Sequence, residues 1–181
     1  MGLVSFFLSI ILILLKVGDE KAAIKKIPWG VLILISGVSV LMNLTKTMGG
    51  IDLLADILSS MMNDKTAPSI IGLTAGLMSW FSSANGVVFP TLIPTVSKIV
   101  ADIGGNISAI ELIIAIVGGA TVAGISPLST GGSLILAAYS QETDSTEKDE
   151  QNLFAKLFIT SFFVVIIITI FAFLGIFKIF S

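Results

Sequence analysis

The chain has 181 residues, of which 55% are hydrophobic and 12% are charged, and its mean hydropathy is +1.05. Soluble domains carry about a quarter charged residues, so this composition excludes a soluble globular protein and indicates an integral membrane protein. The net charge of -2 and the lack of a basic stripe give no support to a nucleic-acid partner.

The residue types that are missing limit the chemistry further. The chain has no Cys, His or Arg, so all 10 basic residues are Lys. Haem, zinc and imidazole proton relays are therefore not expected, and no cofactor is predicted. The serines lack a neighbouring base and no catalytic motif is present, which argues against an enzyme. Without a guanidinium, an anion would have to be held by backbone N–H groups, hydroxyls, amides or helix ends.

The N-terminal part predicts two membrane helices joined by a basic connection. Residues 3–15 are apolar and predict a membrane helix rather than a signal peptide, because no basic segment precedes them. Pro28 and Trp29 open a second span that ends near Thr47. The connection at 16–28 is expected on the cytoplasmic side because it is rich in lysine: Lys16, Lys21, Lys25 and Lys26.

A surface helix is predicted next. Residues 50–65 are amphipathic, with Asp52 and Asp56 on one side, and we expect them to lie at the outer interface. Two further ionisable residues, Lys98 and Glu111, fall close to predicted membrane segments, and both are expected at the membrane edge.

The following segment predicts a re-entrant hairpin. The apolar arm at 68–80 would be only about 20 Å long as a helix, which is too short to cross a membrane. A small-polar tip at 82–86 and a returning arm at 87–101 complete a hairpin, residues 67–103, that enters from outside. Two glycines of the first arm have a spacing that allows close helix packing: Gly72 and Gly76.

The C-terminal part predicts a broken membrane helix and a last span. Residues 109–140 are apolar at both ends and interrupted at 124–133, and such a break is tolerated at membrane depth only inside protein or beside a cavity. The acidic segment 141–152 predicts a solvated loop on the cytoplasmic side. Residues 153–177 predict a lipid-facing span that ends outside.

Each of the two interrupted segments could bind both a cation and an anion. Pro90 and Pro127 lack an N–H, so they leave the carbonyls of Gly86 and Ala123 without their usual helical partner, and such carbonyls can bind a cation. Half-helices that start near Gly86 and Gly131 direct N–H groups toward the breaks, which suits an anion. The alternative is that these residues only kink the helices. Two such segments in one small chain favour the binding site of a secondary transporter.

These segments carry a resemblance to known carriers. The sequences FSSANGVVFPTLIP (81–94) and ISPLSTGGSLILA (125–137) resemble the C-terminal half of ion transporter superfamily carriers, as does IPWGVLILISG (27–37). The nearest groups are the divalent anion:sodium symporters and the MatC-type dicarboxylate carriers, which are citrate transporter-like. The resemblance covers nearly the whole chain but only about half of that family's fold.

The resemblance implies an inverted-repeat transporter whose hairpin and broken helix bind sodium and a dicarboxylate. At the hairpin tip the symporters read Ser-Asn-Thr, and this chain retains only Asn85 of that triplet, between Ala84 and Gly86. In the broken helix they read Thr-Pro-Pro-Asn, whereas this chain reads Ser-Pro-Leu-Ser at 126–129, closer to the MatC pattern. Hydroxyls that could replace those lost at the tip belong to Ser82, Ser83 and Thr91.

The candidate site residues lie in these two clusters. Those for substrate are Ser82, Ser83, Asn85, Gly86, Ser126, Pro127, Ser129 and Thr130. Sodium is the candidate coupling ion, and its candidate ligands are Asn85, Gly86 and Ala123.

The sequence thus predicts an all-α membrane protein: a helical bundle with one re-entrant helical hairpin and one broken membrane helix, in one membrane domain. Residues 1–65 would form scaffold helices and residues 66–181 the transporting part. The predicted function is half of a secondary active transporter for small organic anions, with a separate N-terminal half and a second copy of the chain as expected partners. The alternatives are a channel, a small accessory or structural membrane protein, and a fragment without function.

Overall fold

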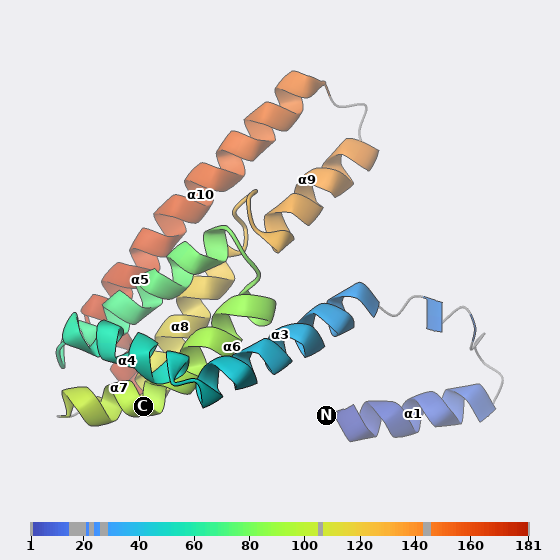
Figure 1. Cartoon of the computed structure of the whole chain (residues 1–181). Coiled ribbons are helices and arrows are strands. Elements are labelled where there is room, and N and C mark those ends of the chain that lie inside the picture. Colours follow the sequence, from blue (N-terminus) through green and yellow to red (C-terminus); the bar gives the residue numbers. More distant parts are fainter. Residues whose placement is uncertain are drawn as a thin grey trace. The chain divides into compact units, whose positions relative to one another are not determined.

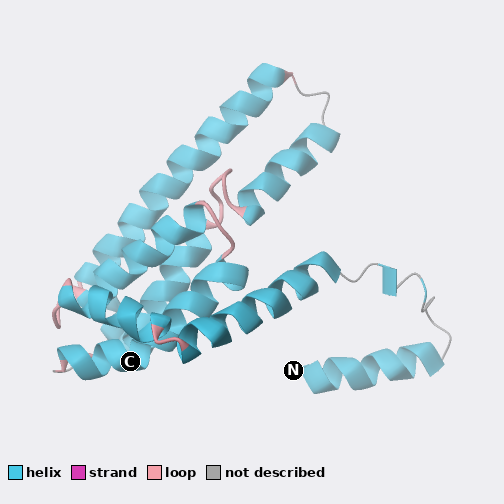
Figure 2. Cartoon of the chain, in the orientation of Figure 1, coloured by secondary structure: helices cyan, strands magenta, loops and turns pink. Residues whose placement is uncertain are grey.

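The computed structural model describes residues 2–14, 21, 24–25, 29–104, 107–142 and 146–180. Most of these residues lie in helices, and none of them lies in a strand (Figures 1 and 2). The chain divides into two compact units, Met1–Leu34 and Ile35–Ser181. The division of the chain into 1–65 and 66–181 stays a prediction.

The first unit contains helix α1, Gly2–Leu14, which agrees with the helix predicted at 3–15. Its large apolar side chains are exposed, as Phe6 and Phe7 show with 63% and 65% of their surface accessible. Such a helix needs lipid or protein around it. Most of the basic connection at 16–28 lies outside the described residues, so its predicted position is untested. Helix α3, Trp29–Thr47, begins in this unit and has the predicted bounds.

The second unit, which also includes the rest of α3, contains a pair of helices held together by apolar and ionic contacts. Helix α4, Gly50–Ser60, buries Ile51, Ala55 and Leu58, as an amphipathic helix should, although it ends before the predicted residue 65. It packs against α7, Val96–Ile103. Charged side chains join the two helices at the surface: Asp56, Lys98 and Asp102.

The centre of this unit is the close packing of α5, Ala67–Trp80, on α8, Ala109–Ala123. A Cβ built on Gly119 would lie 2.2 Å from the carbonyl oxygen of Gly72, so the two backbones touch where neither residue has a side chain. This confirms the predicted role of Gly72 in close packing. Gly76 faces Val165 of α10 instead, where an added Cβ would lie 2.9 Å from a methyl group.

The returning arm is longer than the sequence predicts. It is helical from Ala84 to Ile103, a run of 20 residues, and therefore reaches a length of about 30 Å. The run starts as a π-helix, Ala84–Val88, continues through α6, Phe89–Leu92, and tightens to a 3-10 turn, Ile93–Thr95, before α7. The irregular turns lie around Pro90 and Pro94, because a proline cannot donate the helical hydrogen bond.

The break after α8 spans residues 124–129, and α9 then runs from Thr130 to Glu142. Helix α10, Glu147–Phe173, starts earlier than predicted, because the acidic residues 147–152 form its first turns rather than a loop. A capping box explains this difference. The Asp149 N–H donates to the Thr146 hydroxyl oxygen, and the Thr146 N–H donates to the Asp149 carboxylate. A turn at Gly175, with φ of 73°, leads into the 3-10 segment Ile176–Phe180.

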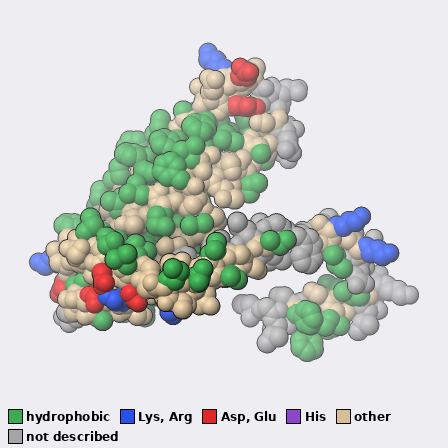
Figure 3. Space-filling view, in the orientation of Figure 1, with side chains coloured by type: hydrophobic (Ala, Val, Ile, Leu, Met, Phe, Trp, Pro, Cys, Tyr) green, Lys and Arg blue, Asp and Glu red, His purple; other side chains and the backbone are tan. Residues whose placement is uncertain are grey.

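The exposed surface of α10 is largely apolar. Within the described chain, two helical runs are long and apolar enough to cross a membrane, Ala84–Ile103 and Glu147–Phe173. Figure 3 shows hydrophobic side chains along α10. The exposed large hydrophobic residues of this helix include Ile159, Phe163 and Ile167. The opposite face is not lipid-facing as predicted, because Ser161, Val165 and Ala172 are buried against the bundle.

Candidate functional site

The two small-polar clusters of the sequence line one cavity. Its volume is about 440 Å³, within the usual size range of small-molecule sites. One wall follows α5, and the other is formed by the end of α8, the break and the first turns of α9. No charged side chain is among its described lining residues: Ser82, Ser83, Ala84, Asn85, Thr121, Gly124, Ile125, Ser129, Thr130, Gly131, Leu134 and Ile135.

The cavity brings together five of the eight residues predicted to bind substrate. Ser82, Ser83 and Asn85 come from the first cluster, and Ser129 and Thr130 come from the second. Asn85 and Thr130 are exposed, so their polar groups are the most accessible to a ligand. The three other predicted residues are buried and do not line the cavity: Gly86, Ser126 and Pro127.

A serine precedes each helix that starts at the cavity. The Ser83 hydroxyl accepts from the Gly86 N–H at 3.1 Å, and the Ser129 hydroxyl accepts from the Gly132 N–H at 3.2 Å. The first N–H groups of a helix have no carbonyl of the helix to bind. Each serine thus satisfies one N–H of its helix start, and the partial positive charge of the two helix ends favours an anion in the cavity.

The buried residues of the break form its scaffold. The Ser126 hydroxyl donates to the carbonyl of Trp80 at 3.2 Å, which joins the break to the end of α5. The Ser129 hydroxyl lies 2.6 Å from the carbonyl oxygen of Gly124 and 2.7 Å from that of Ser126. These bonds close the loop on itself, so Ser126 shapes the cavity wall without lining it.

The carbonyl of Ala123, a predicted sodium ligand, already has two donors. It accepts from the Ser126 N–H at 2.9 Å and from the Ser161 hydroxyl of α10 at 3.2 Å. Ala123 is also fully buried and does not line the cavity. A cation at this oxygen would have to replace these donors. The sodium ligands Asn85, Gly86 and Ala123 remain a prediction.

Sequence reasoning missed other residues of the cavity wall. Thr121 lies one helical turn before Gly124, so its hydroxyl faces the same side of α8 as the break. That spacing could have identified it. Leu134 and Ile135 of α9 form an apolar part of the cavity wall, and no motif in the sequence indicates this role.

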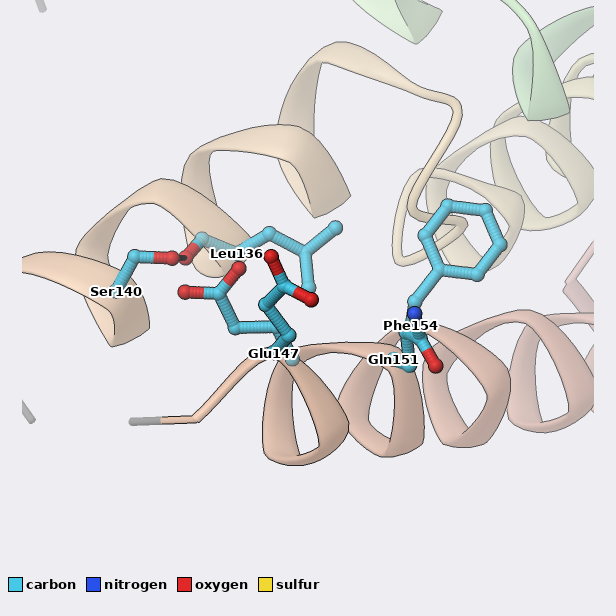
Figure 4. Close-up of a pocket in the computed structure, with 6 residues that line it drawn as sticks. Leu136, Ser140, Glu147, Gln151 and Phe154 are labelled. Carbon is cyan, nitrogen blue, oxygen red and sulfur yellow. Dashed lines mark hydrogen bonds between the residues drawn. The ribbon is translucent and has the colours of Figure 1, made fainter. Parts of the chain in front are cut away.

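A second cavity, of about 550 Å³, lies between α9 and the start of α10 (Figure 4). Its wall carries Glu147 and Glu150 together with Ser140 and Gln151, and no basic side chain is among its described lining residues. Two carboxylates repel an anion, so this cavity does not suit the substrate class indicated by the sequence. The cavity between the two clusters remains the candidate site.

Comparison with known proteins supports a transporter. No match was found among curated proteins or among solved structures. A family model described as citrate transporter matches residues 1–181, the whole of this sequence. The match supports a citrate-transporter-like carrier, without singling out the divalent anion:sodium symporters or the MatC-type carriers. The chain belongs to the citrate transporter family, CitMHS.

Proposed function

We propose that this chain is one half of a secondary active transporter that carries citrate or a small dicarboxylate across the membrane. The single observation that carries the proposal is the cavity of about 440 Å³ between the two polar clusters, in a chain of a citrate transporter family. The partial positive charge of two helix starts favours an anion in that cavity, and Asn85 and Thr130 supply polar side chains.

The proposed membrane arrangement assigns α5 and the run Ala84–Ile103 to an outer re-entrant hairpin, and α8 and α9 to one broken membrane helix. The start of α9 then lies at membrane depth beside the hairpin tip. In transporters built from two repeats, substrate lies between two such breaks. The proposal therefore includes a second half, carried on another polypeptide or elsewhere on a longer one, and a homo-oligomeric assembly.

Orientation and coupling belong to the same proposal. The Lys16 to Lys26 connection is cytoplasmic, and the end at Ser181 is outside. A cation, with sodium as the first candidate, accompanies the anion because Asn85 and the backbone around Gly86 offer oxygen ligands near the negative charge of the substrate. The bilayer surrounds the exposed apolar face of α10.

Substrate-dependent stabilisation tests the site. The chain, reconstituted in vesicles with its second half, should melt at a higher temperature as citrate or succinate is added. Asn85→Ala and Thr130→Ala should each need about ten times more anion for the same rise in melting temperature, since each removes one polar contact of about 1.4 kcal/mol. Ser133→Ala is the matched control, because its hydroxyl bonds the Thr130 carbonyl and does not line the cavity.

An anion response that is equal in all variants would place the substrate elsewhere. The alternative of an accessory membrane protein would be favoured if no tested anion raised the melting temperature and if the chain formed a stable complex with an unrelated membrane protein. For sodium, the same titration is repeated with choline at equal ionic strength. A citrate response that does not differ between sodium and choline would remove sodium from the proposal.

A further inference from the structure

A third cavity is lined by the end of α3, the start of α4 and the returning arm. Its volume is about 160 Å³. Its described lining residues all belong to the second unit: Asn43, Lys46, Ile51, Pro90 and Pro94. None of them lines the candidate substrate cavity. The third cavity is therefore a separate place, although both cavities border the helical run that starts at Ala84.

This cavity differs from the other two in its charge. Lys46 lies in the last turn of α3, and no acidic side chain is among the described lining residues. Within the described part of the chain, Lys46 has no ion pair, whereas Lys98 is held by two carboxylates. The Lys46 ammonium is thus available to an anion, and it repels a cation from so small a space.

The neighbouring polar groups agree with this sign. Asn43 lies three residues before Lys46, on the same face of α3, and its exposed amide can donate two hydrogen bonds. Ile51 lies in the first turn of α4, which has no side-chain cap, so the N–H groups of that turn add partial positive charge. Asp52 of the same turn offsets part of this charge but does not line the cavity. Lys46 therefore decides the sign.

The size of the cavity suits one carboxylate group. A water molecule occupies about 30 Å³ of the liquid, so the space corresponds to about five waters, or to a carboxylate with part of its hydration shell. The rings of Pro90 and Pro94 form an apolar wall without N–H groups. Because Asn43, Lys46 and Pro94 are exposed, the rest of a bound molecule can stay in water.

We propose that this cavity binds a carboxylate group of an organic anion, with the Lys46 ammonium as its charge partner and the Asn43 amide as its hydrogen-bond donor. An exposed ion pair is weak and is screened by salt, so the site holds the anion loosely. In the proposed orientation the end of α3 faces outside, and the site concentrates the anion there. The choice of a carboxylate rests on the proposed function, whereas the positive charge of the site does not.

Protection of Lys46 from an amine-reactive reagent tests this on the full chain in lipid nanodiscs, which leave both membrane faces accessible. Mass spectrometry measures the modification rate of each lysine. Citrate should slow the modification of Lys46 about tenfold once its concentration is about ten times the dissociation constant, because a bound carboxylate covers the amine. Lys65 is the control, because it is exposed and lines none of the cavities described above. Chloride at equal ionic strength separates binding from screening.

The Asn43→Ala variant tests the second group of the site. The citrate concentration that protects Lys46 should rise about fivefold, as expected for the loss of one hydrogen bond. Thr47→Val is the matched control and should leave that concentration unchanged. Thr47 is exposed, does not line the cavity, and donates its hydroxyl to the backbone carbonyl of Asn43 rather than to the side chain.

Two variants of the substrate cavity separate this inference from the proposed function. Asn85→Ala and Thr130→Ala should leave the protection of Lys46 unchanged, since neither residue lines the third cavity. If the proposed function fails, the melting response is equal in these variants while Lys46 is still protected. The inference itself is overturned if citrate protects Lys46 no more than Lys65, if chloride protects it equally, or if Asn43→Ala changes nothing.

Discussion

The indole Nε1 of Trp80 donates a hydrogen bond to the hydroxyl of Ser161, across 2.9 Å. The Ser161 hydroxyl in turn donates to the carbonyl of Ala123 at the end of α8. The Trp80 carbonyl accepts from Ser126 of the break, and the indole ring stacks on Phe162 with centroids 5.7 Å apart. One residue at the end of α5 therefore ties α10, α8 and the break together next to the candidate site.

Trp80→Phe should remove the hydrogen bond to Ser161 while keeping an aromatic ring in place. We expect the free energy of unfolding to fall by about 1 kcal/mol, the net value of one buried hydrogen bond, apart from any loss of packing. A double-mutant cycle with Ser161→Ala isolates the bond and should give a coupling energy of about 0.5–1.5 kcal/mol. Unfolding midpoints in detergent provide the measurement.

The neighbouring Thr160 is exposed and supplies the control for this cycle. Trp80→Phe combined with Thr160→Ala should show no coupling. Additive effects of Trp80→Phe and Ser161→Ala would mean that the bond contributes nothing to stability.

The contact between Gly72 and Gly119 allows a second prediction. Gly119→Ala places a methyl group 2.2 Å from a backbone oxygen, which cannot move as a side chain can. Helices α5 and α8 must separate, and overpacking of this kind lowers the free energy of unfolding by about 1–3 kcal/mol. The unfolding midpoint measures the loss.

Gly118→Ala is the matched control, because its Cβ would lie 3.7 Å from Ile168, an ordinary contact. Both variants change a glycine inside α8 to alanine, so the effect of helix propensity on stability is the same for both. Equal midpoints for Gly118→Ala and Gly119→Ala would show that the two backbones do not touch in the membrane.

Much of the helical pattern could be predicted, since hydrophobic runs and prolines mark the helices and their irregular turns. The prediction for the start of α10 is wrong because acidic composition indicates a solvated loop, although Thr146 and Asp149 have capping-box spacing. The sequence also could not show that Lys98, expected at the membrane edge, meets Asp56 of α4, since that contact depends on tertiary packing.

The two clusters of the candidate site were recognisable because small polar residues stand out in apolar surroundings. Their division into lining and supporting residues was not recognisable. Ser126 and Ser129 look alike in sequence, yet the Ser126 hydroxyl binds Trp80 at the end of another helix. Partners such as Ser161 of α10 come from distant parts of the chain, and one sequence carries no sign of that pairing.

The charged triad between α4 and α7 yields a prediction about salt. The Lys98 ammonium binds the carboxylates of Asp56 and Asp102, and all three side chains are partly exposed. Exposed ion pairs are screened by salt. Lys98→Met should therefore lower the unfolding midpoint at low ionic strength and have less effect in concentrated salt. Asp52→Asn, which changes a carboxylate of α4 outside this triad, is the control, and a salt-independent effect of Lys98→Met would contradict an ionic contribution.

Ser129 and Thr130 are neighbours whose substitution should have different consequences. The Ser129 hydroxyl is buried, accepts from the Gly132 N–H and contacts two carbonyls of the break. Ser129→Ala should thus lower the free energy of unfolding without any ligand by about 1 kcal/mol, as for a lost helix cap, and the unfolding midpoint should fall with it. The exposed Thr130 has no such supporting role in the described contacts, so Thr130→Ala should keep the midpoint and weaken the response to citrate.

Gly132→Ala tests the same loop by a different route. An added Cβ would lie 2.0 Å from the Ser126 carbonyl oxygen, so the break cannot close and both stability and citrate response should be lost. Gly37→Ala, where nothing lies within 4 Å, controls for the change from glycine to alanine in a helix. If Ser129→Ala and Gly132→Ala left the ligand-free midpoint unchanged, the break would not depend on these contacts. Ser129 would then be free to act on the substrate directly, as the sequence alone predicts.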